Sequence, residues 1–218
     1  ISGLNNHVSQ RVEALFGKVA PEELAVEEVC DRVALHREIK LVPQPNVHLP
    51  ELYYYCGRTY EAIGELENAA ELYDVVRTDY PEHDLSSEAT EGLARVEISL
   101  AGNATPIPPP LGSGTAPIGT SVYIVHNDSP EQMKIILSGP ETIIKEIAEC
   151  SICTRLTSDP GECPNKGPIE RITLKPGEYD VVVKSVSDDG VTPYRGNWTF
   201  QSGIEYADCY YILTTTEP

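Results

Sequence analysis

The chain has 218 residues, enough for one large or two modest domains. Thirty-four acidic residues outnumber sixteen basic ones and give a net charge of −18, which argues against binding to nucleic acid or to anionic membrane surfaces. Hydrophobic residues make up 40% of the chain, so we expect a packed core, and no apolar run reaches the roughly eighteen residues of a membrane span. Acidic residues occur throughout the sequence, and we interpret them as a solvated surface and not as a cation site.

Segment 105–118, TPIPPPLGSGTAPI, divides the sequence by its composition because it contains five prolines. Proline lacks a backbone N–H donor and favours polyproline II, so we expect this segment to be a semi-rigid linker. The sequence therefore predicts a first domain over residues 1–104 and a second domain over residues 119–218.

Before the linker, apolar residues recur at the spacing of helices that bury one face. One helix carries Val8, Val12 and Phe16, and a second follows Pro21, which suits a first helical position. Three more are expected over residues 51–63, 66–80 and 86–100, and they bring the predicted total to about five helices.

After the linker, short runs rich in β-branched and aromatic residues alternate with turn signals such as Pro176-Gly177. About seven strands in about one hundred residues predict an antiparallel β-sandwich, which resembles the immunoglobulin-like and prealbumin-like sandwiches without a specific motif. The fold class is therefore α+β with two domains. The expected strands cover residues 121–126, 133–137, 142–148, 169–174, 179–186, 197–200 and 206–214.

Residues 50–83 contain small and aromatic residues at fixed offsets on two expected helices. This pattern resembles the tetratricopeptide repeat, a helix–turn–helix unit of 34 residues, and shifting it by 34 residues in either direction does not reproduce the set. A single repeat cannot bury both of its faces, so the flanking helices should stack on either side of it. The positions that carry the resemblance are Tyr53, Cys56, Gly57, Tyr60, Ala69, Tyr73 and Pro81.

The resemblance implies protein–protein interaction, because such repeats expose a groove lined by the first helix of each pair. Tyr54, Arg58 and Glu61 lie off the expected packing stripe of that helix and are the candidate binding residues. The alternative is that these three are ordinary surface residues.

Six cysteines, four of them after residue 149, favour an oxidising compartment, so we expect a secreted, periplasmic or cell-surface protein. Cys30 and Cys56 lie on expected helices. Two free buried thiols are the expectation there, and a bridge between the helices is the alternative.

The four later cysteines lie in the β-rich half. If Cys150 and Cys153 share a continuous strand, they lie about 10 Å apart and cannot bond to each other. We therefore expect Cys153–Cys163 and Cys150–Cys209 disulfides. A zinc site of the four thiolates is the alternative, but the spacing matches no zinc ribbon or finger.

The sequence contains no HExxH, GxSxG or P-loop motif, so it predicts a protein that is not an enzyme and that needs no metal or cofactor. N-glycosylation sequons begin at Asn103 and Asn197.

The main hypothesis is an extracytoplasmic interaction or scaffold protein with the helices as its binding surface. One rival is a structural subunit that self-associates in an extracellular filament or surface assembly. The other is a carbohydrate-binding β-domain that uses Trp198, Tyr194 and Tyr206.

Overall fold

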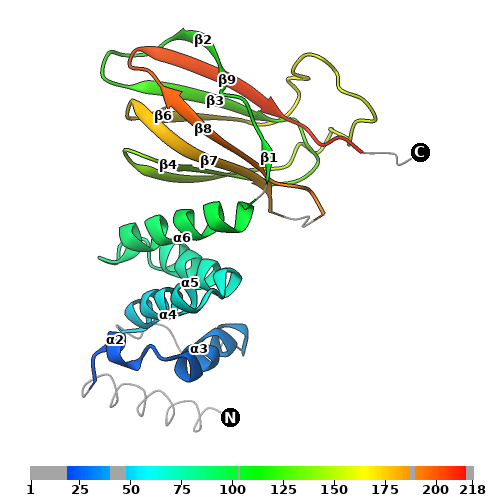
Figure 1. The fold of residues 1–218 in the computed structure, drawn as a ribbon. Helices are drawn as coiled ribbons and strands as arrows, with labels where there is room; N and C mark the ends of the chain where they lie inside the picture. Colours follow the sequence, from blue (N-terminus) through cyan, green and yellow to red (C-terminus); the bar gives the residue numbers. More distant parts are fainter. Residues whose placement is uncertain (1–18, 40–47, 103, 187–189, 215–218) are drawn as a thin grey trace. The chain divides into compact units, whose positions relative to one another are not determined.

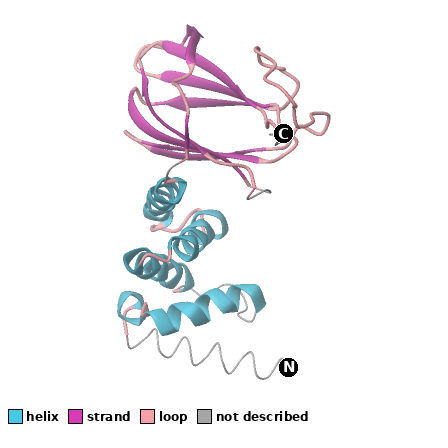
Figure 2. Cartoon of the chain, turned by 45° about the vertical axis from the view of Figure 1, so that its right-hand side comes forward, coloured by secondary structure: helices cyan, strands magenta, loops and turns pink. Residues whose placement is uncertain are grey.

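The computed structural model describes residues 19–39, 48–102, 104–186 and 190–214 (Figures 1 and 2). The chain forms two compact units, Ile1–Leu100 and Ala101–Pro218. The first is helical and the second is built of strands, so the chain is α+β, as the sequence predicts.

The helical unit contains five helices in its described residues. The expected helix with Val8, Val12 and Phe16 lies outside those residues. The bounds of the last three helices fall within two residues of the prediction, because Pro50 and Gly64 mark the start and end of α4. The helices are α2 (Pro21–Leu24), α3 (Glu27–Ile39), α4 (Leu49–Ile63), α5 (Leu66–Asp79) and α6 (Ser86–Ala101).

Gly64 ends α4 because it adopts a φ of 86°, in the left-handed region that favours glycine. Its N–H contacts the carbonyl oxygens of Tyr60 and Glu61, and α5 begins two residues later. This short connection places α4 and α5 side by side as a helical hairpin (Figure 1).

The ring of Tyr73, on α5, packs against two glycines of neighbouring helices. A Cβ atom built on Gly57 of α4 would lie 2.9 Å from the ring, and one built on Gly92 of α6 would lie 2.8 Å from it. Tyr73 is fully buried, as are Cys56 and Ala69. Small residues on α4 and α6 therefore let both helices approach α5 closely.

A disulfide between Cys30 and Cys56 joins α3 to α4. The expectation of two free thiols was therefore wrong. Both residues lie on buried helix faces that meet, and their Cα atoms are 5.2 Å apart. Two hydrogen bonds also join α4 to the chain before it. The Thr59 hydroxyl donates to the Ala25 carbonyl oxygen, and the Tyr60 hydroxyl donates to the Asp31 carboxylate.

The β unit consists of two sheets that face each other as a sandwich (Figure 2). The strand order is β1-β8-β7-β4-β5 in one sheet and β2-β9-β3-β6 in the other. The strands are β1 (Thr105–Pro106), β2 (Leu111–Thr115), β3 (Ser121–Asn127), β4 (Met133–Ser138), β5 (Thr142–Ile147), β6 (Ile169–Leu174), β7 (Gly177–Ser185), β8 (Tyr194–Phe200) and β9 (Ile204–Tyr210).

Nine strands are present where about seven were predicted, and the sheets are mixed and not purely antiparallel. β1 runs parallel to β8, and β3 runs parallel to β9. Both extra strands lie in segment 105–118, so the prediction of a linker there was wrong. Its backbone pairs along two sheet edges, where proline and glycine are tolerated.

The core between the sheets is rich in aromatic residues. Trp198 is 1% exposed and contacts Tyr123 and Phe200 edge to face, with ring centroids 5.7 and 6.1 Å apart. Its indole N–H donates to the Ile107 carbonyl oxygen. Trp198 is therefore a core residue, and the proposed stacking of a sugar on its ring was wrong.

Candidate functional site

The three candidate binding residues lie along α4. Tyr54 is half-buried, and its ring contacts those of Tyr55 and Tyr73 at centroid distances of 5.3 and 5.8 Å. The Arg58 side chain, one turn later, is 56% exposed, and its guanidinium lies 4.0 Å from the Glu22 carboxylate. Tyr54 and Arg58 thus offer an aromatic edge and an accessible cation on successive turns.

Glu61 is held by contacts within the unit. Its carboxylate accepts hydrogen bonds from the Arg95 guanidinium and, at 2.8 Å, from the Tyr73 hydroxyl. The Arg95 hydrogen bond is the main cause that lowers the pKa of Glu61, with the Tyr73 hydroxyl acting in the same direction. Glu61 therefore links α4 to α5 and α6 and fixes Arg95 beside the candidate residues.

Sequence reasoning missed Arg95, which lies on α6 and is mostly exposed. The separation between Glu61 and Arg95 is 34 residues, the length of the suspected repeat. The same separation joins Ala25 to Thr59. Oppositely charged residues 34 positions apart, such as Glu61 and Arg95, are the sequence signal that could have indicated this contact.

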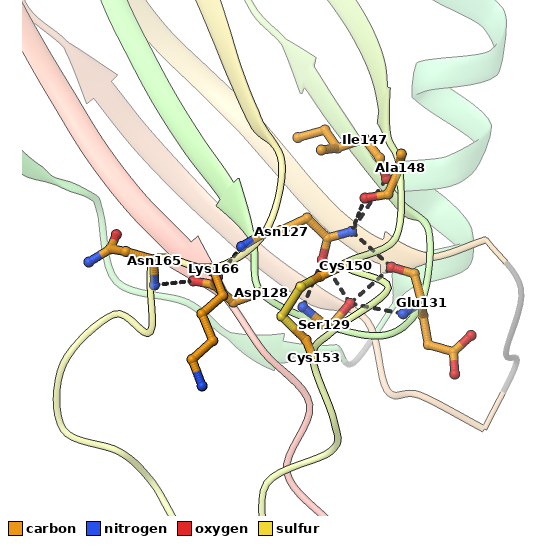
Figure 3. Close-up of a disulfide and its surroundings, with 11 residues drawn as sticks. Asn127, Asp128, Ser129, Glu131, Ile147, Ala148, Cys150, Cys153, Asn165 and Lys166 are labelled. Atoms are coloured by element: carbon orange, nitrogen blue, oxygen red, sulfur yellow. Dashed lines mark hydrogen bonds between the residues drawn. A yellow bond between two sulfur atoms is a disulfide. The ribbon is translucent and has the colours of Figure 1, made fainter.

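At one end of the β unit, the side chain of Asn127 joins three segments (Figure 3). Its Nδ2 group donates to the carbonyl oxygens of Glu131, Ile147 and Ala148, and its Oδ1 atom accepts from the N–H and hydroxyl of Ser129. Asn127 is fully buried. The end of β3, the turn after it and the end of β5 are therefore held by one amide.

The neighbouring Asp128 anchors the long loop before β6. Its carboxylate accepts hydrogen bonds from the backbone N–H groups of Asn165, Lys166 and Gly167. A Cβ atom at Gly167 would lie 1.7 Å from the Asn127 carbonyl oxygen, so only glycine fits there. The Asn127-Asp128 pair therefore organises the loops at this end.

Disulfides join Cys150 to Cys153 and Cys163 to Cys209. The predicted Cys153–Cys163 and Cys150–Cys209 pairs were therefore wrong. The predicted pairs required Cys150 and Cys153 to lie on one continuous strand, but β5 ends at Ile147 and the chain then turns, with the Cys153 N–H donating to the Cys150 carbonyl oxygen. The turn brings the two Cα atoms to 5.2 Å.

A pocket of about 540 Å³ opens at this same end of the β unit. Four of its lining residues are buried, namely Ser129, Met133, Val183 and Tyr210. Further lining residues come from β7, β8, the loops after β5 and β7, and the chain after β9. They include Arg155, Lys184, Val191, Thr192, Tyr194, Tyr211, Ile212, Leu213 and Thr214.

The remaining predicted site residues are dispersed. Asn197 is exposed on β8, and Asn103 lies outside the described residues. Tyr194 lines the pocket, whereas Tyr206 packs on Phe200 and its hydroxyl accepts the Gln201 N–H. In the described ranges, no cluster of three or more His, Cys, Asp or Glu side chains could hold a metal ion.

No protein-family model, no curated protein and no solved structure matches the chain. The three disulfides indicate an oxidising, extracellular environment. None of the helices in the described part of the chain has both the length and the apolar character of a membrane span.

Proposed function

We propose that the protein is a non-enzymatic, extracytoplasmic interaction protein whose helical unit binds a protein partner. In this proposal the unit is a short array related to tetratricopeptide repeats. α4 and α6 are the inner helices of successive pairs, and α5 lies between them. The packing of Tyr73 against Gly57 and Gly92 supports this, because it repeats the small-against-aromatic contact of the suspected repeat on both sides of α5.

The observation that carries the proposal is the surface formed by Tyr54, Arg58 and Arg95. Tyrosine and arginine are, with tryptophan, the residue types enriched at positions that dominate binding energy in protein interfaces. The Glu61 bonds restrain Arg95, so little side-chain entropy remains to be lost on binding. We call this set the α4–α6 surface.

Self-association in an extracellular filament or surface assembly is the second candidate function. The exposed edge strand β2 favours it, since Leu111 is 81% exposed there and an unpaired edge can accept a strand from another copy. The carbohydrate hypothesis keeps only Tyr194, because Trp198 is buried in the core.

Photo-crosslinking in the native host tests the proposal and separates it from self-association. A photoreactive phenylalanine analogue replaces Tyr54 or Arg58, and the exposed Glu67 of α5 is the control position. We expect a discrete adduct with a different protein from positions 54 and 58 and none from position 67. An adduct between two copies of this chain would support the assembly instead, and no adduct, or equal adducts from all three positions, would refute the binding surface.

A further inference from the structure

The turn between β2 and β3 presents an isoleucine to solvent at the end of the β unit opposite to the pocket. We propose that this turn, residues 116–120, enters the pocket of a second copy of the chain, so that β units associate head to tail. The inference rests on self-association, the second candidate function, and gives it a contact other than the β2 edge. It is independent of partner binding at the α4–α6 surface.

The surface of the turn is apolar and uncharged. Ile118 is the most exposed of the large hydrophobic side chains in the described residues, at 96%. Segment 98–127, which includes the turn, has no Asp, Glu, Lys or Arg, although these residues make up 23% of the chain. Two copies that each carry a net charge of −18 repel each other, and an uncharged segment is where they can touch at the least electrostatic cost.

Hydrogen bonds fix the backbone of the turn. The Thr120 N–H and hydroxyl both donate to the Pro117 carbonyl oxygen, at 3.1 and 2.9 Å. The Gly119 N–H donates to the Ser202 hydroxyl at 2.8 Å, and Gly119 adopts a φ of 90°, which a type II turn requires at its third residue. Because the turn is already held in place, little backbone entropy is lost when a second copy buries Ile118.

The pocket offers apolar surface to such a side chain. Met133, Val183 and Tyr210 line it and are buried, and Leu213 lines it and is 44% exposed. Its volume of about 540 Å³ is larger than one isoleucine side chain, so the rest of the turn can enter together with Ile118.

The turn cannot reach the pocket of its own copy, because β3 separates them (Figure 1). β3 begins at Ser121, directly after the turn, and ends at Asn127, two residues before Ser129 in the pocket lining. Its seven residues span about 20 Å in extended conformation. A projection and a complementary pocket at opposite ends of one unit make a heterologous contact, which leaves a free turn and a free pocket and so adds further copies.

The test measures the average mass of the full chain by sedimentation and light scattering at about 10 µM to 1 mM. We expect the mass of the wild type to rise beyond that of a dimer, and Ile118→Asp to weaken the association by at least about tenfold, because its carboxylate would lose hydration in the pocket. Leu111→Asp is the matched control, because Leu111 belongs to the same uncharged segment and is 81% exposed on β2. It should change the association by less than about twofold.

Mixing two variants tests the head-to-tail geometry. Leu213→Asp alters the pocket and leaves the turn intact, whereas Ile118→Asp alters the turn and leaves the pocket intact. Each variant alone should be monomeric. Their equal mixture should form dimers and no larger species, because only one contact can form between an intact turn and an intact pocket. A mixture that stays monomeric, or that grows beyond dimers, would overturn the proposal.

Two other results would overturn the proposal, and they differ in their consequence for the proposed function. Association of Ile118→Asp equal to that of the wild type would exclude this contact and leave self-association through another surface, such as the β2 edge. A wild type that stays monomeric at every concentration would exclude both, and partner binding at the α4–α6 surface would still be decided by photo-crosslinking. Fluorescence of the buried Trp198 verifies that the β unit of each variant is folded.

Discussion

Replacing Asn127 with alanine removes the amide that joins the loops at the pocket end of the β unit. The side chain is fully buried, its two Nδ2 hydrogens are shared among three carbonyl oxygens, and its Oδ1 atom accepts two hydrogen bonds from Ser129. Alanine leaves those carbonyl oxygens and the Ser129 donors without these partners in a buried site.

The expected destabilisation follows from these bonds. A typical hydrogen bond contributes about 1 kcal/mol net, and a buried polar group left without its partner costs about 1–3 kcal/mol. Water that enters the space left by the side chain recovers part of this loss. We therefore expect Asn127→Ala to lower the free energy of unfolding of the β unit by about 3–4 kcal/mol.

Urea titration monitored by tryptophan fluorescence measures this loss in the β unit alone. Trp198 is the single tryptophan of the chain and is 1% exposed in that core. Asn197→Ala is the control, since Asn197 is exposed and makes only a 3.4 Å bond to Asp180, and it should change stability by less than about 0.5 kcal/mol. A loss below about 1 kcal/mol in Asn127→Ala, at an unchanged slope with urea, would show that the Asn127 hydrogen bonds do not stabilise this end of the β unit.

Three further predictions concern packing, pH and the long disulfide. Gly92→Ala should lower the free energy of unfolding of the helical unit by about 1–2 kcal/mol, because the added methyl group would lie 2.8 Å from the Tyr73 ring and overpacking outweighs the gain in helix propensity. Urea titration followed by circular dichroism measures this loss. An unchanged free energy of unfolding would show that the ring moves freely. The folded-state pKa of Glu61 is lowered, so its carboxylate stabilises the fold above the unfolded-state pKa, and that stability is lost as pH falls through the folded-state pKa. Glu61→Gln should therefore flatten the decline in the stability of the helical unit below about pH 5. An unaltered decline would contradict the hydrogen bonds described for Glu61. Replacing both Cys163 and Cys209 by serine should lower the stability of the β unit by about 4 kcal/mol, by the chain-entropy estimate for a 46-residue separation. A loss below about 1 kcal/mol in the fluorescence titration would show that other contacts fix the loop.

The sequence predicted the helices and the central strands closely because their signals are local. The expected strand over residues 169–174 matches β6 at both ends, and those over residues 121–126 and 133–137 each fall one residue short of β3 and β4. β-branched runs between turn residues decide these bounds.

The edge strands and the parallel pairings were missed because they depend on contacts between distant segments. β2 has the sequence LGSGT, whose glycines indicate a turn or linker, and it becomes a strand only by pairing with β9. Likewise, no local pattern indicates that β3 and β9 run parallel.

In the candidate sites too, local spacing predicts some of the contacts, and contacts between distant segments decide the others. Spacing along one helix was enough to propose Tyr54 and Arg58 as neighbours, whereas the role of Glu61 depends on Arg95 from another helix. The pocket draws on Arg155, Lys184 and residues after β9, which only the folded sandwich brings together. The predicted disulfide pairs were wrong because a single turn after β5, which the sequence pattern does not reveal, brings Cys150 and Cys153 together.

Binding of the crosslinked partner to charge-reversed variants measures whether the α4–α6 surface is the binding site. Arg58→Glu alters the α4–α6 surface, and Arg32→Glu makes the same change at an exposed arginine of α3 that also pairs with a glutamate. We predict that Arg58→Glu weakens binding of the purified partner by at least about tenfold and that Arg32→Glu changes it less than about twofold. Equal affinity of the wild type and Arg58→Glu, or equal losses in the two variants, would contradict the claim.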